Sequence, residues 1–279
     1  MSDPRLARYL DLWQLVPDGA AFETPSSWLL FVRQHQTPAV LKLPKPASDE
    51  QQSASALAHY AGRGAVRLLA HDESGVLLME RAIPGTELAA LSRDGRDAEA
   101  TQIFCDVVES LHTRKPPQRA FKTLDDLAAG FVRYAKNPRP DLLPPPLVAR
   151  AEDMFRELCA SQGEPFLLHG DLHHMNMLRD SRGWLAIDPK GIIGELAYET
   201  ASLLHNPIPD FEMIADENIM EGRVRILSDR LQLDRARILR WCFAKNILGH
   251  LWTVEDRHDD GNFPRSLRVA QTALALLGE

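Results

Sequence analysis

The feature that most constrains the fold of this 279-residue chain is a change of hydrophobic pattern near residue 83. Residues 27–43 (SWLLFVRQHQTPAVLKL) contain two short apolar runs around a polar turn, which predicts a hairpin. Residues 48–60 have apolar positions at helical spacing, and residues 65–72 and 75–82 are again strand-like. The order strand, strand, helix, strand, strand predicts a small antiparallel sheet that carries one helix.

Beyond residue 83 nearly every long segment has helical spacing. Strand-like runs return only in FLLH, NMLR and WLAID. We therefore expect an N-terminal lobe over 1–82, a linker over 83–88 and a mostly helical lobe over 89–279. The segments with a helical pattern are 98–112, 148–159, 211–231, 234–253 and 264–277.

Composition limits the possible partners. A content of 44% hydrophobic and 25% charged residues is typical of a globular protein. The net charge of -7 argues against nucleic acid as a partner. No apolar run approaches the roughly 18 residues of a membrane span, and the start MSDPRLARYL lacks the order of a secretory signal. We expect a cytoplasmic protein with no membrane partner.

Two neighbouring segments concentrate polar side chains behind apolar runs. In FLLHGDLHHMNML, Asp171 is followed five residues later by Asn176, and in WLAIDPKG a strand ends at Asp188. Two carboxylates and an amide are oxygen ligands, which suit Mg²⁺ with bound phosphates better than zinc. In phosphoryl transfer one aspartate orients the acceptor hydroxyl and takes its proton, while an asparagine and a second aspartate hold the metal. This pattern predicts a phosphotransferase site.

Lys42, on the second strand of the predicted hairpin, completes an ordered set of motifs. The order of Lys42, HxD with an asparagine five residues after the aspartate, and a strand ending in aspartate resembles the protein-kinase-like superfamily. The forms HGDLHHMN and IDPKG, with ERAIPG before them and WTVED near the end, look like the aminoglycoside and hydroxyurea phosphotransferase family, which includes streptomycin 6-kinases. The likeness runs from about residue 26 to residue 256.

The resemblance implies a two-lobed protein-kinase-like α/β (α+β) fold that uses ATP and Mg²⁺. It makes Asp171 the catalytic base, Asn176 and Asp188 the metal ligands, and Lys42 the partner of the α- and β-phosphates. The loop before residue 28 takes the place of a glycine-rich phosphate lid, although it contains no GxGxxG. The remaining nucleotide-binding residues that the resemblance implies, in this loop and at the hinge beside the adenine, are Ser26, Ser27, Glu80, Arg81 and Ala82.

Around these residues the resemblance implies supporting and acceptor-binding roles. His169 and Glu199 are expected to shape the catalytic loop through its backbone. A kinase-like site normally pairs the strand lysine with a helix glutamate, but this chain has Ser53 at that position, and Glu50 one turn earlier could serve instead. The residues expected to line the site of a cationic acceptor are His174, Trp252, Glu255 and Asp256.

The expected reaction moves the γ-phosphate of ATP to a hydroxyl of a small cationic molecule, with an aminoglycoside such as streptomycin as the first candidate. The motifs leave an endogenous metabolite open as the acceptor, because function resides in the site rather than in the fold. A catalytically weak nucleotide-binding regulatory protein is the other alternative, favoured by Ser53 and by the missing glycine motif.

Overall fold

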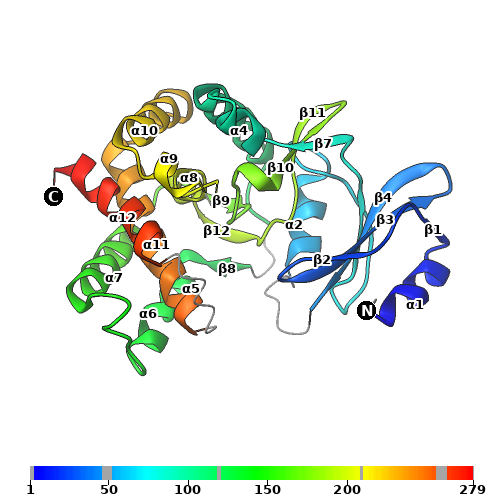
Figure 1. Ribbon diagram of the computed structural model, residues 1–279, viewed down its shortest axis with the longest axis horizontal. Coiled ribbons are helices and arrows are strands. Elements are labelled where there is room, and N and C mark those ends of the chain that lie inside the picture. Colours follow the sequence, from blue (N-terminus) through cyan, green and yellow to red (C-terminus); the bar gives the residue numbers. More distant parts are fainter. Residues whose placement is uncertain (1–2, 46–51, 118–120, 208–209, 256–262, 279) are drawn as a thin grey trace.

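A computed structural model of the chain describes residues 3–45, 52–117, 121–207, 210–255 and 263–278. The N-terminal part is an antiparallel sheet with the order β1-β3-β4-β6-β5, and β2 pairs with the free part of β3. Helix α1 lies against this sheet, and α2 lies between it and the helices that follow (Figure 1). The elements of this part are α1 (Arg5–Leu12), β1 (Leu15–Pro17), β2 (Phe22–Glu23), β3 (Ser27–Gln34), β4 (Thr37–Pro44), α2 (Ser53–Tyr60), β5 (Leu68–His71) and β6 (Leu77–Glu80).

The hairpin of β3 and β4 separates two chemically different faces. Leu30 and Leu41 are buried together with Leu6 and Tyr9 of α1 in a small core. Because side chains alternate along a strand, Lys42 projects from the other face. The register pairs Leu29 with Lys42 and Phe31 with Val40, so apolar side chains flank the lysine on that face.

The following segment joins the sheet to the rest of the molecule. The Ile83–Pro84 peptide is cis, and β7 (Pro84–Glu87) pairs with β10 (Met177–Asp180). A further link lies near Gly64, because the Ala186 N–H donates to the Gly64 carbonyl at 2.7 Å and the Val66 N–H donates to the Ala186 carbonyl at 3.0 Å. The predicted linker thus contains a strand of the second part, and the division into lobes at 83–88 stays a prediction.

The C-terminal part is mostly helical, with two small sheets in the orders β11-β10-β7 and β8-β12-β9. Its elements are α3 (Ala89–Arg93), α4 (Asp97–Leu111), β8 (Lys122–Thr123), α5 (Leu124–Leu127), α6 (Ala129–Tyr134), α7 (Pro145–Ala160), β9 (Pro165–Leu168), the 3-10 turn η1 (His174–Asn176), β10, β11 (Gly183–Ala186), β12 (Ile192–Glu195), α8 (Leu196–Leu204), α9 (Phe211–Ile214), α10 (Glu217–Leu231), α11 (Arg235–Glu255) and α12 (Phe263–Leu277).

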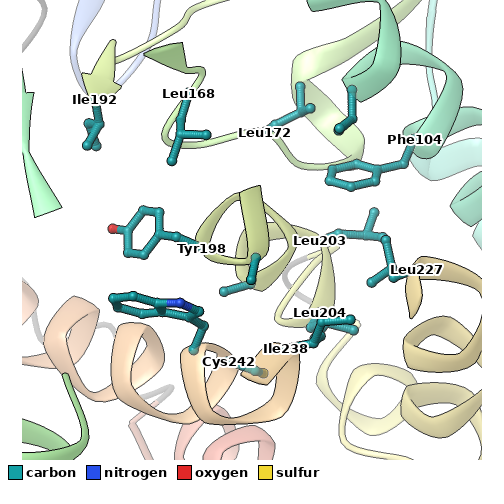
Figure 2. Close-up of a cluster of buried hydrophobic side chains, with 14 of the residues drawn as sticks. Phe104, Leu168, Leu172, Ile192, Tyr198, Leu203, Leu204, Leu227, Ile238 and Cys242 are labelled. Carbon is teal, nitrogen blue, oxygen red and sulfur yellow. The ribbon is translucent and has the colours of Figure 1, made fainter. Parts of the chain in front are cut away.

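Helix α8 is the centre of the main core. Every residue from 197 to 204 is buried. Figure 2 shows Tyr198 and Leu203 between side chains of the β9 segment on one side and of α11 on the other, with Leu168 and Leu172 pointing toward α8. The loop between Leu168 and Leu172, which carries Asp171, is therefore anchored at both ends by buried leucines.

The expected fold class, a small antiparallel sheet with a helix followed by a mostly helical part, is confirmed. One predicted helix differs, because the segment 211–231 is divided into α9 and α10. The Asp216 carboxylate accepts N–H bonds from Asn218 at 2.9 Å and Ile219 at 3.0 Å, so it caps a new helix. Within the described residues, no helix combines the length and apolar character that a bilayer span requires.

Candidate active site

The backbone of Gly170 sets the geometry of the loop before Asp171. Its φ of +85° lies in the left-handed region that favours glycine. A Cβ atom at this position would lie 2.7 Å from Ile192 Cδ1 and 3.3 Å from Lys190 Cβ. The loop therefore passes closely over β12, and a glycine is needed there for both its φ and its size.

His169 connects this loop to the strand that ends in Asp188. Its Nε2–H donates to the Ile187 carbonyl at 2.7 Å, and its Nδ1 accepts the Asp171 N–H at 3.3 Å. Burial lowers the pKa of His169 to about 4, so the ring is neutral at pH 7 and can both donate and accept. His169 thus binds the backbone of both loops.

The Asn176 side chain binds the backbone of Asp171, which lies five residues earlier in the chain. The Asp171 side chain is 38% exposed, and the Asn176 amide group donates to the Asp171 backbone carbonyl at 2.9 Å. His173 lies beside both, with its Nε2 atom 3.8 Å from Asp171 Oδ2 and 3.3 Å from Asn176 Nδ2. Its Nδ1 accepts the Met175 N–H at 3.2 Å, which fixes the ring against the 3-10 turn.

Asp188 pairs with Lys42, which is 146 positions away in the sequence. The Lys42 Nζ atom is 2.5 Å from Asp188 Oδ1, and Lys42 is 4% exposed. Burial raises the pKa of Asp188, but the charges of Lys42 and Lys190 outweigh this effect and leave its pKa below the usual value. The φ of +61° at Asp188 is uncommon for a residue with a side chain and marks a sharp turn after β11.

The hairpin of β10 and β11 brings the two expected metal ligands to the same end. Met177 is paired with Ala186, and the Ile187 N–H donates to the Asn176 carbonyl at 2.9 Å. Asn176 therefore lies across the hairpin from Ile187, next to Asp188. Because the Asn176 nitrogen is bound to backbone, its oxygen is the atom left for a cation. A carboxylate and an amide oxygen fit a magnesium ion that is also held by phosphate and water.

Glu199 and Lys245 form hydrogen bonds with the backbone of the loop that carries Asp171. Glu199 is fully buried in α8, and its carboxylate accepts the His169 N–H at 2.6 Å and the Gly170 N–H at 3.0 Å. Burial raises the pKa of Glu199 to about 7, while Lys245 and the two N–H bonds oppose that rise. Lys245 was not anticipated from sequence, although a single lysine within the apolar run WCFAKNILGHLW was a signal for it.

The expected hinge residues lie at the end of β6. Glu80 uses its N–H for the Arg67 carbonyl at 2.9 Å and its carboxylate for Arg182 at 2.6 Å. Arg81 stacks over the Phe31 ring, with its guanidinium carbon 3.9 Å from the ring centroid. The side chains of Glu80 and Arg81 are thus engaged in protein contacts, and the hinge role of the backbone of residues 80–82 stays a prediction.

The loop expected to cover the phosphates is a tight turn between β2 and β3. The Ser27 N–H donates to Thr24 Oγ1 at 3.0 Å, and the Thr24 N–H donates to the Ser27 carbonyl at 2.8 Å. Ser27 is fully buried, so its hydroxyl does not line an open surface, which differs from its expected role. Ser26 is partly exposed, and its carbonyl accepts the Lys45 N–H at 2.8 Å.

The expectation for His174 was wrong. This residue is fully buried and cannot line an open acceptor site. His173, the residue before the 3-10 turn, is the histidine that lies beside Asp171. The sequence alone could not show which histidine is buried, because a shift of one residue in the turn changes which ring points into the core.

Trp252 and Glu255 lie at the end of α11, against α6. A Cβ atom on Gly130 would lie 2.9 Å from Trp252 Nε1, so the indole edge packs closely on α6. Arg133 Nε donates to Glu255 Oε2 at 3.3 Å, which means that this carboxylate already has a cationic partner. Asp256 and Glu50, the other expected carboxylates, lie outside the described residues, and Ser53 is buried at the start of α2.

Comparisons with known proteins agree with this geometry. Residues 12–257 match the model of the family described as aminoglycoside/hydroxyurea antibiotic resistance kinase. The chain belongs to this family. The resemblance inferred from HGDLHHMN and IDPKG is thereby confirmed, and the chain is a member of a kinase family.

Two relatives and one solved structure show how far the similarity extends. The chain is 35% identical to the streptomycin 3''-kinase of Klebsiella pneumoniae over 88% of its length and 91% of the relative. It is 30% identical to the streptomycin 6-kinase of Streptomyces griseus over 90% and 82% of the two chains. The crystal structure of a thermostable mutant of aminoglycoside phosphotransferase APH(4)-Ia, with ADP and hygromycin B, has the same fold. Its TM-score is 0.67 at 16% identity, with 98% of both chains covered.

Proposed function

We propose that this kinase family member transfers the γ-phosphate of ATP to a hydroxyl of a streptomycin-like aminoglycoside. The observation that carries the proposal is the convergence of Asp171, Asn176 and Asp188 at the ends of two loops that His169 joins. The similarity to streptomycin kinases over nearly the whole chain supports the acceptor class.

In the proposed mechanism Asp171 holds the acceptor. Its partly exposed carboxylate accepts a hydrogen bond from the acceptor hydroxyl and orients the oxygen toward the γ-phosphorus. As the new oxygen–phosphorus bond forms, the bond from the γ-phosphorus to the bridging oxygen breaks and ADP leaves. The hydroxyl proton passes to Asp171. The His173 ring lies beside the same carboxylate, with Nε2 3.8 Å from Asp171 Oδ2.

Lys42 and Asp188 are proposed to exchange partners when nucleotide binds. Their ion pair keeps both buried charges compensated. A triphosphate would offer Lys42 an anionic oxygen, and Asn176 and Asp188 would hold the Mg²⁺ bound to that triphosphate. A magnesium ion there supplies charge neutralisation for the phosphates. The nucleotide base would lie against the face of the sheet that carries Lys42 and Val40, with the backbone of Ala82 beside it.

The acceptor is proposed to extend from Asp171 toward the end of α11. Lys245 contacts the loop at Gly170, and Trp252 lies seven residues later on the same face, about 10 Å along the helix axis. An acceptor with several rings could span that distance. Its cationic group would compete with Arg133 for Glu255, which gives a physical basis for preferring a guanidinium-bearing sugar.

The test is a transfer assay with ATP, Mg²⁺ and streptomycin, in which mass spectrometry detects one added phosphoryl group. Two-dimensional NMR of the product would show whether a hydroxyl of the streptidine ring or of the terminal sugar is modified. Asp171→Asn should reduce turnover by a factor of about 10² to 10⁴ and leave nucleotide affinity unchanged. Failure of the wild-type protein to modify streptomycin or related aminoglycosides would overturn the acceptor class, and full turnover by the Asn variant would overturn the role of Asp171.

A further inference from the structure

Lys245 is a buried ammonium group directly beneath the candidate catalytic loop. It is 6% exposed and lies within an apolar stretch of α11. Its Nζ atom donates to the Gly170 carbonyl at 3.1 Å and to Ser202 Oγ at 2.6 Å, and lies 4.2 Å from the centroid of the Tyr198 ring. Burying a charge is unfavourable, and an uncharged side chain of similar length would fill the same space without that penalty. Packing alone therefore does not explain why a charged lysine occupies this position.

Lys245 contacts the loop at a single peptide unit. The carbonyl that it binds belongs to the peptide between Gly170 and Asp171, and the N–H of that peptide donates to His169 Nδ1 at 3.3 Å. On the other side of Gly170, its own N–H donates to Glu199 at 3.0 Å. The buried carboxyl group of Glu199 thus binds the Gly170 N–H, and the buried ammonium group of Lys245 binds the Gly170 carbonyl. A side chain at position 170 could not help to fix this peptide, because its Cβ atom would collide with Ile192.

We propose that Lys245 is a positioning residue for Asp171, which acts by fixing the peptide that precedes this aspartate. The proposal rests on the proposed phosphotransferase activity and adds to it a residue that touches neither substrate nor nucleotide. Rotation of this peptide would swing the Asp171 carboxylate away from the acceptor hydroxyl. Since the nucleotide side depends on Lys42, Asn176 and Asp188, a defect at Lys245 should affect turnover and not nucleotide binding.

The experiment compares Lys245→Met with Lys245→Gln in the full-length protein. Methionine is one atom shorter than lysine and has neither donor nor charge, so kcat should fall about 10- to 100-fold, in line with the sensitivity of catalysis to small displacements. Glutamine is also one atom shorter but keeps an N–H donor toward the Gly170 carbonyl, so its kcat should lie between those of the methionine variant and wild type. The KM for ATP and the Kd for ADP should change by less than about twofold in both variants.

Two controls separate this role from a general loss of stability. Cys242→Ala removes a buried thiol one turn earlier on α11 and leaves the bond from Lys245 to the Gly170 carbonyl in place, so it should lower the unfolding midpoint but not kcat. If Lys245→Met does not fold, Lys245→Gln alone decides, because a reduced kcat with normal ADP affinity supports the proposal. Wild-type kcat in either folded Lys245 variant would overturn it. Wild-type and Asp171→Asn proteins run in the same assay show separately whether the proposed activity itself holds.

Discussion

Replacing Gly170 with alanine should be costly for reasons that can be worked out separately. A φ of +85° in a residue with a Cβ costs about 1–2 kcal/mol. The added methyl group would lie 2.7 Å from Ile192 Cδ1, and overpacking of a buried site costs about 1–3 kcal/mol. The lower entropy of the unfolded alanine chain returns about 0.4–1 kcal/mol. Gly170→Ala should therefore reduce the free energy of unfolding by about 1–5 kcal/mol.

The collision can be tested with Ile192→Val, which removes the Cδ1 atom. By itself this change should cost about 0.5–1.5 kcal/mol, because it leaves a small cavity in a residue that is 7% exposed. In the double variant the nearest contact of the new Cβ would become Cγ1, at 3.1 Å. The two changes should therefore cost less together than the sum of their separate effects, with a coupling energy of about 1 kcal/mol or more.

Urea unfolding followed by tryptophan fluorescence measures each free energy, and kcat is measured in parallel. The single alanine variant should also lose turnover, because the Gly170 carbonyl and the following Asp171 would shift together. Additive stability changes in the Gly170→Ala and Ile192→Val pair would refute the steric argument. A destabilisation below about 1 kcal/mol in the alanine variant would refute the backbone argument as well.

Two further predictions concern the metal and pH. Asp188→Asn should remove the gain in ADP affinity that Mg²⁺ provides. Isothermal titration with ADP, in the presence of Mg²⁺ or of EDTA, measures this gain. An equal gain in the variant and in the wild-type protein would contradict the assignment. The pKa values of His112 and His169 are lowered by burial to about 4, so below pH 6.5 the unfolded chain binds protons that the folded chain does not. Stability should therefore decrease as pH falls from about 6.5 toward 4, by up to about 1.4 kcal/mol per pH unit for each histidine, partly offset by Glu199, whose raised pKa has the opposite sign. Urea midpoints that do not decrease over this range would contradict the prediction.

Much of the fold and part of the site could be predicted from sequence. Strand and helix periodicity is a local property, and it placed β3, β4, α4 and α7 within a few residues of their observed bounds. Asp171, Asn176 and Asp188 could be grouped because they lie within one short stretch, where a hairpin necessarily brings its two ends together. Lys42 was added only through the resemblance to a family, since no local pattern connects it with Asp188.

The amino-acid sequence by itself determined the order of the elements and grouped Asp171, Asn176 and Asp188 as candidate oxygen ligands. Only the tertiary structure decided that His173 rather than His174 lies beside Asp171, that Ser27 turns inward, and that Lys245 supports the Gly170 carbonyl from α11. The physical reason is that side-chain direction within a short turn, and contacts between segments 75 residues apart, follow from how α8 and α11 pack beneath the loop. That packing is a property of the whole core, and no local stretch of sequence encodes it.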